Sequence, residues 1–337
     1  IYTFYKKSDA YTYYYLTLTR TFSHIEPGSH FISNICYLLG NIGNLSFMNV
    51  FAIFNFIGFL GLLFLTLSLN KIKKIELNNY YILIIFLPSI SFWSSAIGKD
   101  AISFLAICLF VWSSIDLKKK IHISIISVLI MFLVRPHISI VMLFSLAIAV
   151  IFQKNIQKSI KIFIFIFLSL SFAILLPIVS NFVNIKIDYF SISNTFSTIK
   201  GYISLKMVGN ISESAGIDLS SMNFIEIIFT FYFRPLPFET NNFMQLFTSV
   251  ENVILIIFFL TAITFKILSP LSSNKIKYSN IQLWIYIIIV TFLLSSTQAN
   301  LGITSRQKWM VLPILIFIFY NFFNSKEYLF KKNKLTN

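Results

Sequence analysis

The chain has 337 residues, of which 57% are hydrophobic and 12% charged, with a mean hydropathy of +0.79. Soluble domains carry about 25% charged residues, so this composition excludes an ordinary soluble domain and indicates an all-α, polytopic membrane protein. The net charge of +15 suggests nucleic acid, but the lysines stand in short clusters between apolar runs. Such clusters orient membrane helices, so we expect no nucleic-acid partner.

The chain opens with Ile rather than Met, on a polar and tyrosine-rich stretch. We expect the natural N-terminus, together with one further membrane helix, to precede it. Residues 1–45 are predicted as an outer loop. The two cysteines, Cys36 and Cys108, fall outside and within the membrane in this topology, so they imply neither a disulfide nor a metal framework.

Nine apolar runs predict membrane helices. In chain order they are Phe47–Leu69, Tyr80–Ser95, Ala101–Ile115, Ile121–Val134, Ile138–Phe152, Ile162–Ser180, Asn252–Leu268, Ile281–Ser296 and Trp309–Phe323. Lysine clusters at 71–74, 118–120, 154–161, 266–277 and 326–334 are each two spans apart. Because lysine clusters stay on the cytoplasmic side, residue 1 is predicted outside and the tail 324–337 inside. We therefore predict a single membrane domain, 1–337, with membrane helices in 46–180 and 252–323.

The two helices predicted on either side of Arg135-Pro136-His137 are unusually short. Each has roughly 14–15 apolar residues, or about 21–23 Å of helix, whereas the hydrocarbon core is about 30 Å thick. The turn should therefore lie below the outer surface, where irregular backbone survives only against protein or in a water-filled cavity. The Lys99-Asp100 turn is predicted in a similar but shallower position. The sequence thus predicts a polar recess open to the outside.

Residues 181–251 are predicted as one large outer loop. Its second half contains an apolar stretch from Phe224 to Phe233 that is too short to span a membrane and includes Glu226. We expect an interfacial or re-entrant helix there, ending at Arg234-Pro235.

All four arginines, Arg20, Arg135, Arg234 and Arg306, fall in or beside segments predicted on the outer face. Every positive residue predicted on the inner face is a lysine. Charge orientation accepts either residue type on the inner side. The segregation therefore suggests that the outer face uses guanidinium groups, which bind phosphate or carboxylate in a planar, bidentate geometry.

Each candidate site also has a simpler interpretation. Asp9 is either a general base or an incidental charge in an interfacial tyrosine belt. Asp100 is either part of the recess or the cap of the helix that begins there, while Lys99 pairs with Asp100 or with a ligand phosphate. Arg135, a charge at membrane depth, is a functional candidate by default, unless it pairs internally with Asp100 or another acid of the outer face.

Arg234 and the string Arg306-Gln307-Lys308 flank helices at the predicted outer interface. They either bind an anionic substrate or anchor the helices by extending their charges into water.

Four strings resemble those of membrane-embedded glycosyltransferases that use lipid-linked sugars. They are Asp9-Ala10 followed by Tyr13 in an early outer loop, Lys99-Asp100 at a helix start, Arg135-Pro136-His137 at a hairpin, and 300–308 before the last span. More narrowly, the chain is similar to bacterial O-antigen and exopolysaccharide polymerases of the Wzy and EpsG type. The resemblance implies a reaction on the outer face of the bacterial inner membrane, in which polyprenyl-diphosphate-linked glycan units are joined.

The resemblance also implies roles for individual residues. Cations must stabilise the diphosphate as it leaves, and a base must accept the proton of the attacking hydroxyl. The expected diphosphate ligands are Arg135, Lys99, Arg234, Arg306 and Lys308; the expected base is Asp9, with His137 as the alternative; Tyr11, Asp100 and Glu239 would support them. We expect no organic cofactor, leave a divalent metal open, and expect chain-length or export proteins as partners besides membrane lipid.

Two other functions stay open at this point. The paired arginine-rich loops often associated with polymerases are not identifiable, which leaves a transferase of single sugars from a polyprenyl-phosphate donor. A transporter or flippase of lipid-linked glycan would bind its substrate near the midplane, at broken helices related by internal repeats. The charges here gather near one face and we find no repeat, so a transferase is favoured.

Overall fold

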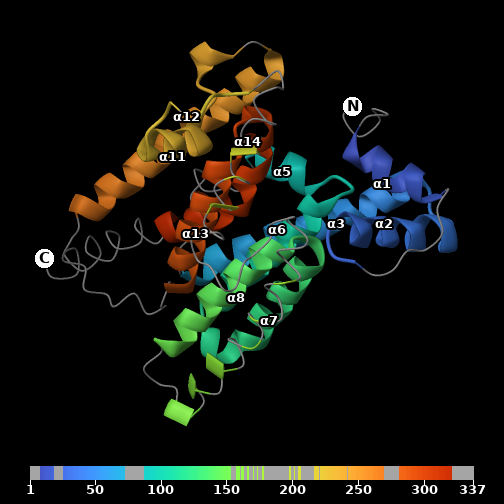
Figure 1. The fold of residues 1–337 in the computed structure, drawn as a ribbon, viewed down its shortest axis with the longest axis horizontal. Coiled ribbons are helices and arrows are strands. Elements are labelled where there is room, and N and C mark those ends of the chain that lie inside the picture. The colour runs from blue at the N-terminus through green and yellow to red at the C-terminus, as the bar shows by residue number, and fades with distance from the viewer. Residues whose placement is uncertain are drawn as a thin grey trace, which may run out of the picture. The chain divides into compact units, whose positions relative to one another are not determined.

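The computed structural model describes residues 8–18, 26–72, 87–152, 216–219, 221–240, 242–268 and 281–320, with scattered residues between 157 and 205 (Figure 1). In this part of the chain every regular element is a helix, which confirms the all-α class. The chain divides into two compact units. The first unit comprises Ile1–Asn70 and Leu77–Leu168, and the second comprises Lys71–Glu76 and Ser169–Asn337.

The first unit contains seven described α-helices and one π-helical turn. They are α1 (Asp9–Leu18), α2 (Ser29–Tyr37), η2 (Leu38–Ile42), α3 (Phe47–Ile72), α5 (Pro88–Ser94), α6 (Lys99–Ser114), α7 (Leu117–Val134) and α8 (Pro136–Ile151). Two helices, α1 and α2, therefore occupy the segment that we expected to be an outer loop. Of the predicted span Tyr80–Ser95, residues 80–86 lie outside the described residues, and the rest is helical only from Pro88, an imino acid suited to a first helical turn.

In the described part of the second unit, two helices, α12 (Phe243–Leu268) and α13 (Ile281–Thr297), are long and the others are short. In chain order the helices are α11 (Phe224–Phe233), η3 (Pro237–Glu239), α12, α13, α14 (Leu301–Gln307), η4 (Lys308–Met310) and a helix over Leu312–Tyr320. The described α12 helix starts inside the segment 181–251 that we predicted as the large outer loop. The α12 helix begins nine residues before Asn252 because the Asn242 side chain accepts a hydrogen bond from the Gln245 amide at 2.9 Å, as helix caps do.

The last predicted span, Trp309–Phe323, also differs from the structure. A bend of 53° separates the helical segment Leu301–Met310 from Leu312–Tyr320, so this pair is either one broken span or a re-entrant loop. Residues 321–323 lie outside the described part of the chain. The short helix α11 ends where we expected, with Arg234 in an extended conformation as its C-cap.

Among the described residues, two helices are long and apolar enough to cross a membrane, α3 over Phe47–Lys71 and α12 over Gln245–Thr264, and the bent pair would make three. The apolar helices α6, α8 and α13 have 16, 16 and 17 residues. Helices of this length reach about 24–26 Å, less than a full hydrocarbon core. The apolar helices thus indicate a membrane protein with short helices, while the nine-span count is not confirmed.

Small residues bring the helices of the first unit close together. A Cβ on Gly58 of α3 would lie 2.1 Å from the carbonyl oxygen of Ser94, at the end of α5. The hydroxyls of Ser113 on α6 and Ser124 on α7 are 2.5 Å apart, and Ser139 of α8 donates to the Val128 carbonyl at 2.9 Å. Serines and glycines of this kind permit close helix packing where lipid offers no hydrophobic driving force.

Candidate functional site

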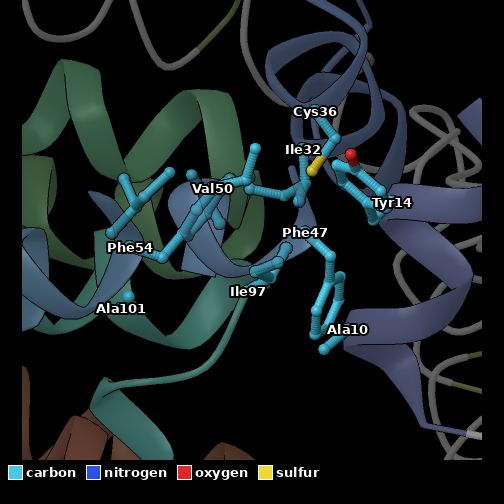
Figure 2. Packing of buried hydrophobic residues seen from close by; sticks show 11 residues of the cluster. Ala10, Tyr14, Ile32, Cys36, Phe47, Val50, Phe54, Ile97 and Ala101 are labelled. Carbon is cyan, nitrogen blue, oxygen red and sulfur yellow. The ribbon is translucent and has the colours of Figure 1, made fainter. Parts of the chain in front are cut away.

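A buried apolar cluster brings together the three predicted site strings of the first unit. Ala10 of α1, Ala101 of α6 and Val134 of α7 all belong to it, together with α2 and α3 residues such as Cys36 and Phe54 (Figure 2). Each of the three residues is the immediate chain neighbour of a predicted site residue: Asp9, Asp100 and Arg135, respectively. The packing of this cluster therefore places the three helix ends that carry these charges around one core.

The central contact is an ion pair between α6 and the turn after α7. Nη2 of Arg135 lies 2.6 Å from Oδ1 of Asp100, and their side chains are only 13% and 6% exposed. Asp100 follows Lys99 in the first turn of α6, whose N-cap is Gly98. Internal pairing of Arg135, one of the alternatives above, is thus observed. Asp100 lies in the first turn of α6 and also binds the Arg135 side chain.

Lys99 and His137 lie beside this pair. Lys99 begins α6 and is partly buried, and its carbonyl accepts a hydrogen bond from Ser103 at 2.8 Å. His137 is the second residue of α8, and the positive charges of Arg135 and Lys99 both act on its imidazole. We call Lys99, Asp100, Arg135 and His137 the Arg135 cluster.

Asp9 is exposed in the first turn of α1. Two hydrogen bonds start this helix, because the Ser8 hydroxyl accepts the Tyr11 amide at 3.3 Å and the Ser8 carbonyl accepts the Thr12 amide at 3.1 Å. The Tyr11 ring lies tilted against that of Tyr15, with centroids 4.2 Å apart and an interplanar angle of 31°. Asp9 and two neighbouring tyrosine rings therefore lie on one helix.

Tyr14, on the other face of α1, is structural. Its hydroxyl donates to the Leu45 carbonyl at 2.7 Å, and the ring is buried in the cluster of Figure 2. Burial, with smaller effects of Tyr15 and Cys36, raises the pKa of Tyr14. Burial also raises the pKa of the Cys36 thiol to about 12.

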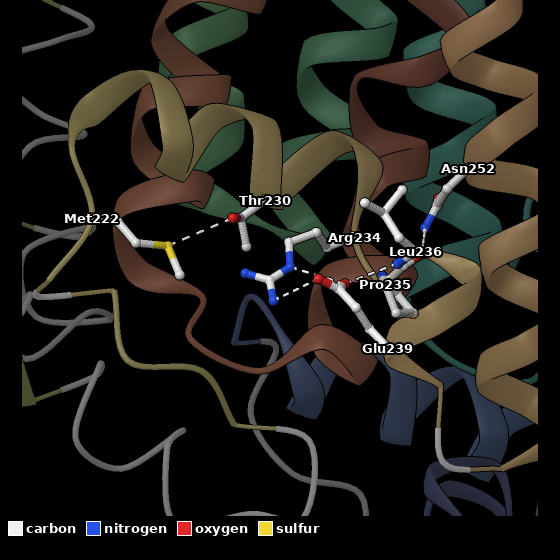
Figure 3. Close-up of polar contacts among 7 residues, drawn as sticks. All are labelled: Met222, Thr230, Arg234, Pro235, Leu236, Glu239 and Asn252. Atoms are coloured by element: carbon white, nitrogen blue, oxygen red, sulfur yellow. Dashed lines mark hydrogen bonds and ion pairs between the residues drawn. The ribbon is translucent and has the colours of Figure 1, made fainter.

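The second unit holds a separate group of charges at the end of α11 (Figure 3). Arg234 binds Glu239 with two nitrogens, at 3.0 Å from Nε to Oε2 and 2.8 Å from Nη2 to Oε1. Oε2 of Glu239 also accepts the Leu236 amide at 2.9 Å. Glu239 therefore closes the turn that follows α11 and orients the guanidinium.

Lys308 lies behind this turn and is almost fully buried, with 3% exposure. Its ammonium donates to the Arg234 carbonyl at 3.2 Å and to Oδ1 of Asn252 at 2.8 Å. Asn252 in turn donates to the Pro235 carbonyl at 2.9 Å. We call Arg234, Glu239, Asn252 and Lys308 the Arg234 cluster.

The remaining predicted arginines differ in their setting. Arg306 is partly buried on α14, a helix capped by the Asn300 side chain, which accepts the Gly302 amide at 2.8 Å. Arg20 lies outside the described residues. Within the first unit the structure brings Lys99, Asp100 and Arg135 together; a meeting of Arg135 with the arginines of the second unit stays a prediction.

Sequence reasoning missed Asn252 and Glu251, which are buried on α12. The signal was available, since polar residues within an apolar helix are costly and usually have a partner. We had placed both at the loop boundary, where polar side chains need no such explanation. In the described part of the chain no group of three His, Cys, Asp or Glu residues is arranged to hold a metal ion.

Comparison of the chain with protein-family models, curated proteins and solved structures finds no match.

Proposed function

We propose that the chain is a membrane glycosyltransferase that joins polyprenyl-diphosphate-linked glycan units on the outer face of a bacterial inner membrane. The observation that carries this proposal is the Arg135 cluster. It combines two basic side chains, Lys99 and Arg135, with one carboxylate, Asp100, at the start of α6 and the apex of α7 and α8. Basic side chains that lie this close together suit a phosphate group.

The ion pair itself fits a binding role for Arg135. A guanidinium has five N–H donors in a fixed plane, a geometry that suits the binding of a carboxylate and of a phosphate. Asp100 fixes the direction of that plane before substrate arrives. Preorganised donors of this kind stabilise developing charge at low cost during the reaction.

In the proposed reaction, a hydroxyl of the acceptor glycan attacks the anomeric carbon of the donor. The new glycosidic bond forms as the bond from that carbon to the diphosphate oxygen breaks, and the lipid diphosphate leaves with the bonding electrons. Arg135 and Lys99 take up its negative charge. Asp9 accepts the hydroxyl proton, with His137 as the alternative base.

One observation favours a second candidate function, the transport of a lipid-linked anion. The helix broken between Met310 and Leu312, with Lys308 buried next to the break, has the form of the discontinuous helices at which transporters bind substrate. The exposed Asp9 and the partly buried Lys99 at helix starts favour the transferase instead.

The two functions separate in sealed vesicles that contain the purified chain and a lipid-linked oligosaccharide in one leaflet. A transferase lengthens the glycan and releases lipid diphosphate without moving substrate across the membrane. A single-sugar transferase yields products longer by one residue. Translocation of unchanged substrate would contradict the proposal and establish a transporter.

A further inference from the structure

Lys308 is too deeply placed to meet a bulky lipid phosphate directly. Its ammonium is enclosed by the Arg234 carbonyl and the Asn252 amide oxygen, and the buried Glu251 carboxylate acts on it from α12. An ammonium has three donors, and two of them are directed at these oxygens. The group contacts the backbone of the turn that carries Arg234, which points to a role through that residue.

The turn after α11 is held from two sides. Lys308 and Asn252 bind the consecutive carbonyls of Arg234 and Pro235 on one side. Glu239 binds the Arg234 side chain and the Leu236 amide on the other. A turn fastened in this way keeps the guanidinium in one position instead of a range of rotamers.

One nitrogen of this guanidinium faces away from its partner. Nε and Nη2 are both engaged by Glu239, whereas Nη1 points away from that carboxylate and makes no hydrogen bond to the described residues (Figure 3). The Arg234 side chain is 26% exposed. Large apolar side chains flank the turn, with Phe238 83% and Phe243 77% exposed. A cation beside exposed apolar surface matches an amphiphile with an anionic head.

We infer that Lys308 and Asn252 are positioning residues that hold Arg234 in place to bind the phosphate of an isoprenoid lipid. The choice of an isoprenoid tail rests on the proposed function; the binding of an amphiphilic phosphate does not. Arg234 binds the head through its outward-facing nitrogen, and the tail lies along Phe238 and Phe243.

The test is equilibrium binding of radiolabelled farnesyl diphosphate to the full chain in detergent, with farnesol as the uncharged control. Lys308→Met removes the ammonium at similar length. Asn252→Asp keeps the acceptor for Lys308 but removes the donor to Pro235. Losing one buried hydrogen bond costs roughly a factor of ten, so each variant should raise the Kd about tenfold, as should Arg234→Lys. Ser296→Ala, on α13, serves as the matched control and should leave the Kd unchanged.

A double variant separates positioning from general destabilisation. If Lys308 acts through Arg234, Lys308→Met should add almost nothing to the Kd of Arg234→Lys. Fully additive effects, or a wild-type Kd in a folded Lys308→Met or Asn252→Asp variant, would overturn the inference. So would binding that is lost in Arg135→Lys and intact in Arg234→Lys. If Lys308→Met does not fold, Asn252→Asp decides. Because the measurement needs no turnover, its outcome is independent of whether the chain transfers sugars.

Discussion

Asp100 and Arg135, 35 residues apart in the chain, form a 2.6 Å ion pair between the first turn of α6 and the turn that joins α7 to α8. The pair is buried beside the apolar cluster that contains Ala101 and Val134. Two charges removed from water are tolerated only when each has a partner. The pair therefore both supports the fold of the first unit and presents Arg135 in a fixed orientation.

Removal of one partner should destabilise the first unit strongly. Asp100→Asn or Arg135→Gln leaves one buried charge without its counter-charge, which typically costs about 3–5 kcal/mol. The double variant removes both charges and should be less destabilised than the sum of the single variants. Thermal unfolding in a mild detergent measures this, and strictly additive losses would mean that the two residues do not interact.

Alanine at Gly58 should separate α3 from α5. The added Cβ would lie 2.1 Å from the Ser94 carbonyl oxygen and 2.9 Å from its carbon, so backbone must move. Overpacking of this kind costs about 1–3 kcal/mol. The matched control is Gly201→Ala, because a Cβ there meets no described atom within 4 Å. Equal unfolding temperatures for the two variants would show that α5 does not pack on α3 as described.

Neither native cysteine should react with a maleimide in the folded protein. Cys36 and Cys108 are fully buried, and the thiolate is the reactive species. With its pKa raised to about 12, the Cys36 thiol stays protonated from pH 7 to pH 9, and its thiolate fraction grows only as the pH approaches that value. Unfolding in detergent with denaturant should expose both.

Phe238→Cys provides the positive control for this experiment, because residue 238 is 83% exposed. It should be labelled within minutes under conditions that leave Cys36 and Cys108 unmodified. Rapid labelling of Cys36 in the folded protein would place α2 outside the cluster of Figure 2.

The two candidate bases should respond differently to substitution by the amides Asn and Gln. Asp9 is exposed in the first turn of α1, accessible to an incoming hydroxyl, whereas His137 is beside the cations Lys99 and Arg135. Asp9→Asn should lower kcat by about 10²–10⁴, the usual contribution of a general base, with little change in KM. His137→Gln should keep kcat within about tenfold. The opposite ranking would assign the proton transfer to His137.

Local signals in the sequence predicted much of the helical pattern. The run from Phe47 predicted α3 to within three residues of its end. No charged residue interrupts this mostly apolar run before Lys71, so the sequence marks the end of the helix clearly. Arg135-Pro136 predicted the break between α7 and α8, since proline restricts the preceding residue to extended conformations, and Arg135 has φ −140° and ψ 78°.

Contacts between distant residues were harder to predict. Lys308 meets Arg234 and Asn252, 74 and 56 residues away, and no local pattern identifies such partners. The bend near Val311 was missed because the apolar run continues through it. Asp100 and Arg135 were recognised as a possible pair only because both are charges predicted near the outer face.

The binding role of Arg135 is tested most directly by the turnover of reconstituted Arg135→Lys protein. Lysine keeps the positive charge, and with it much of the electrostatic balance with Asp100, but loses the planar fork. We expect normal membrane insertion and at least a hundredfold loss in the release of polyprenyl diphosphate from a lipid-linked glycan donor, while Lys119→Arg, at an exposed site of α7, retains full turnover. Wild-type turnover by Arg135→Lys would contradict a binding role and leave Arg135 as a structural partner of Asp100.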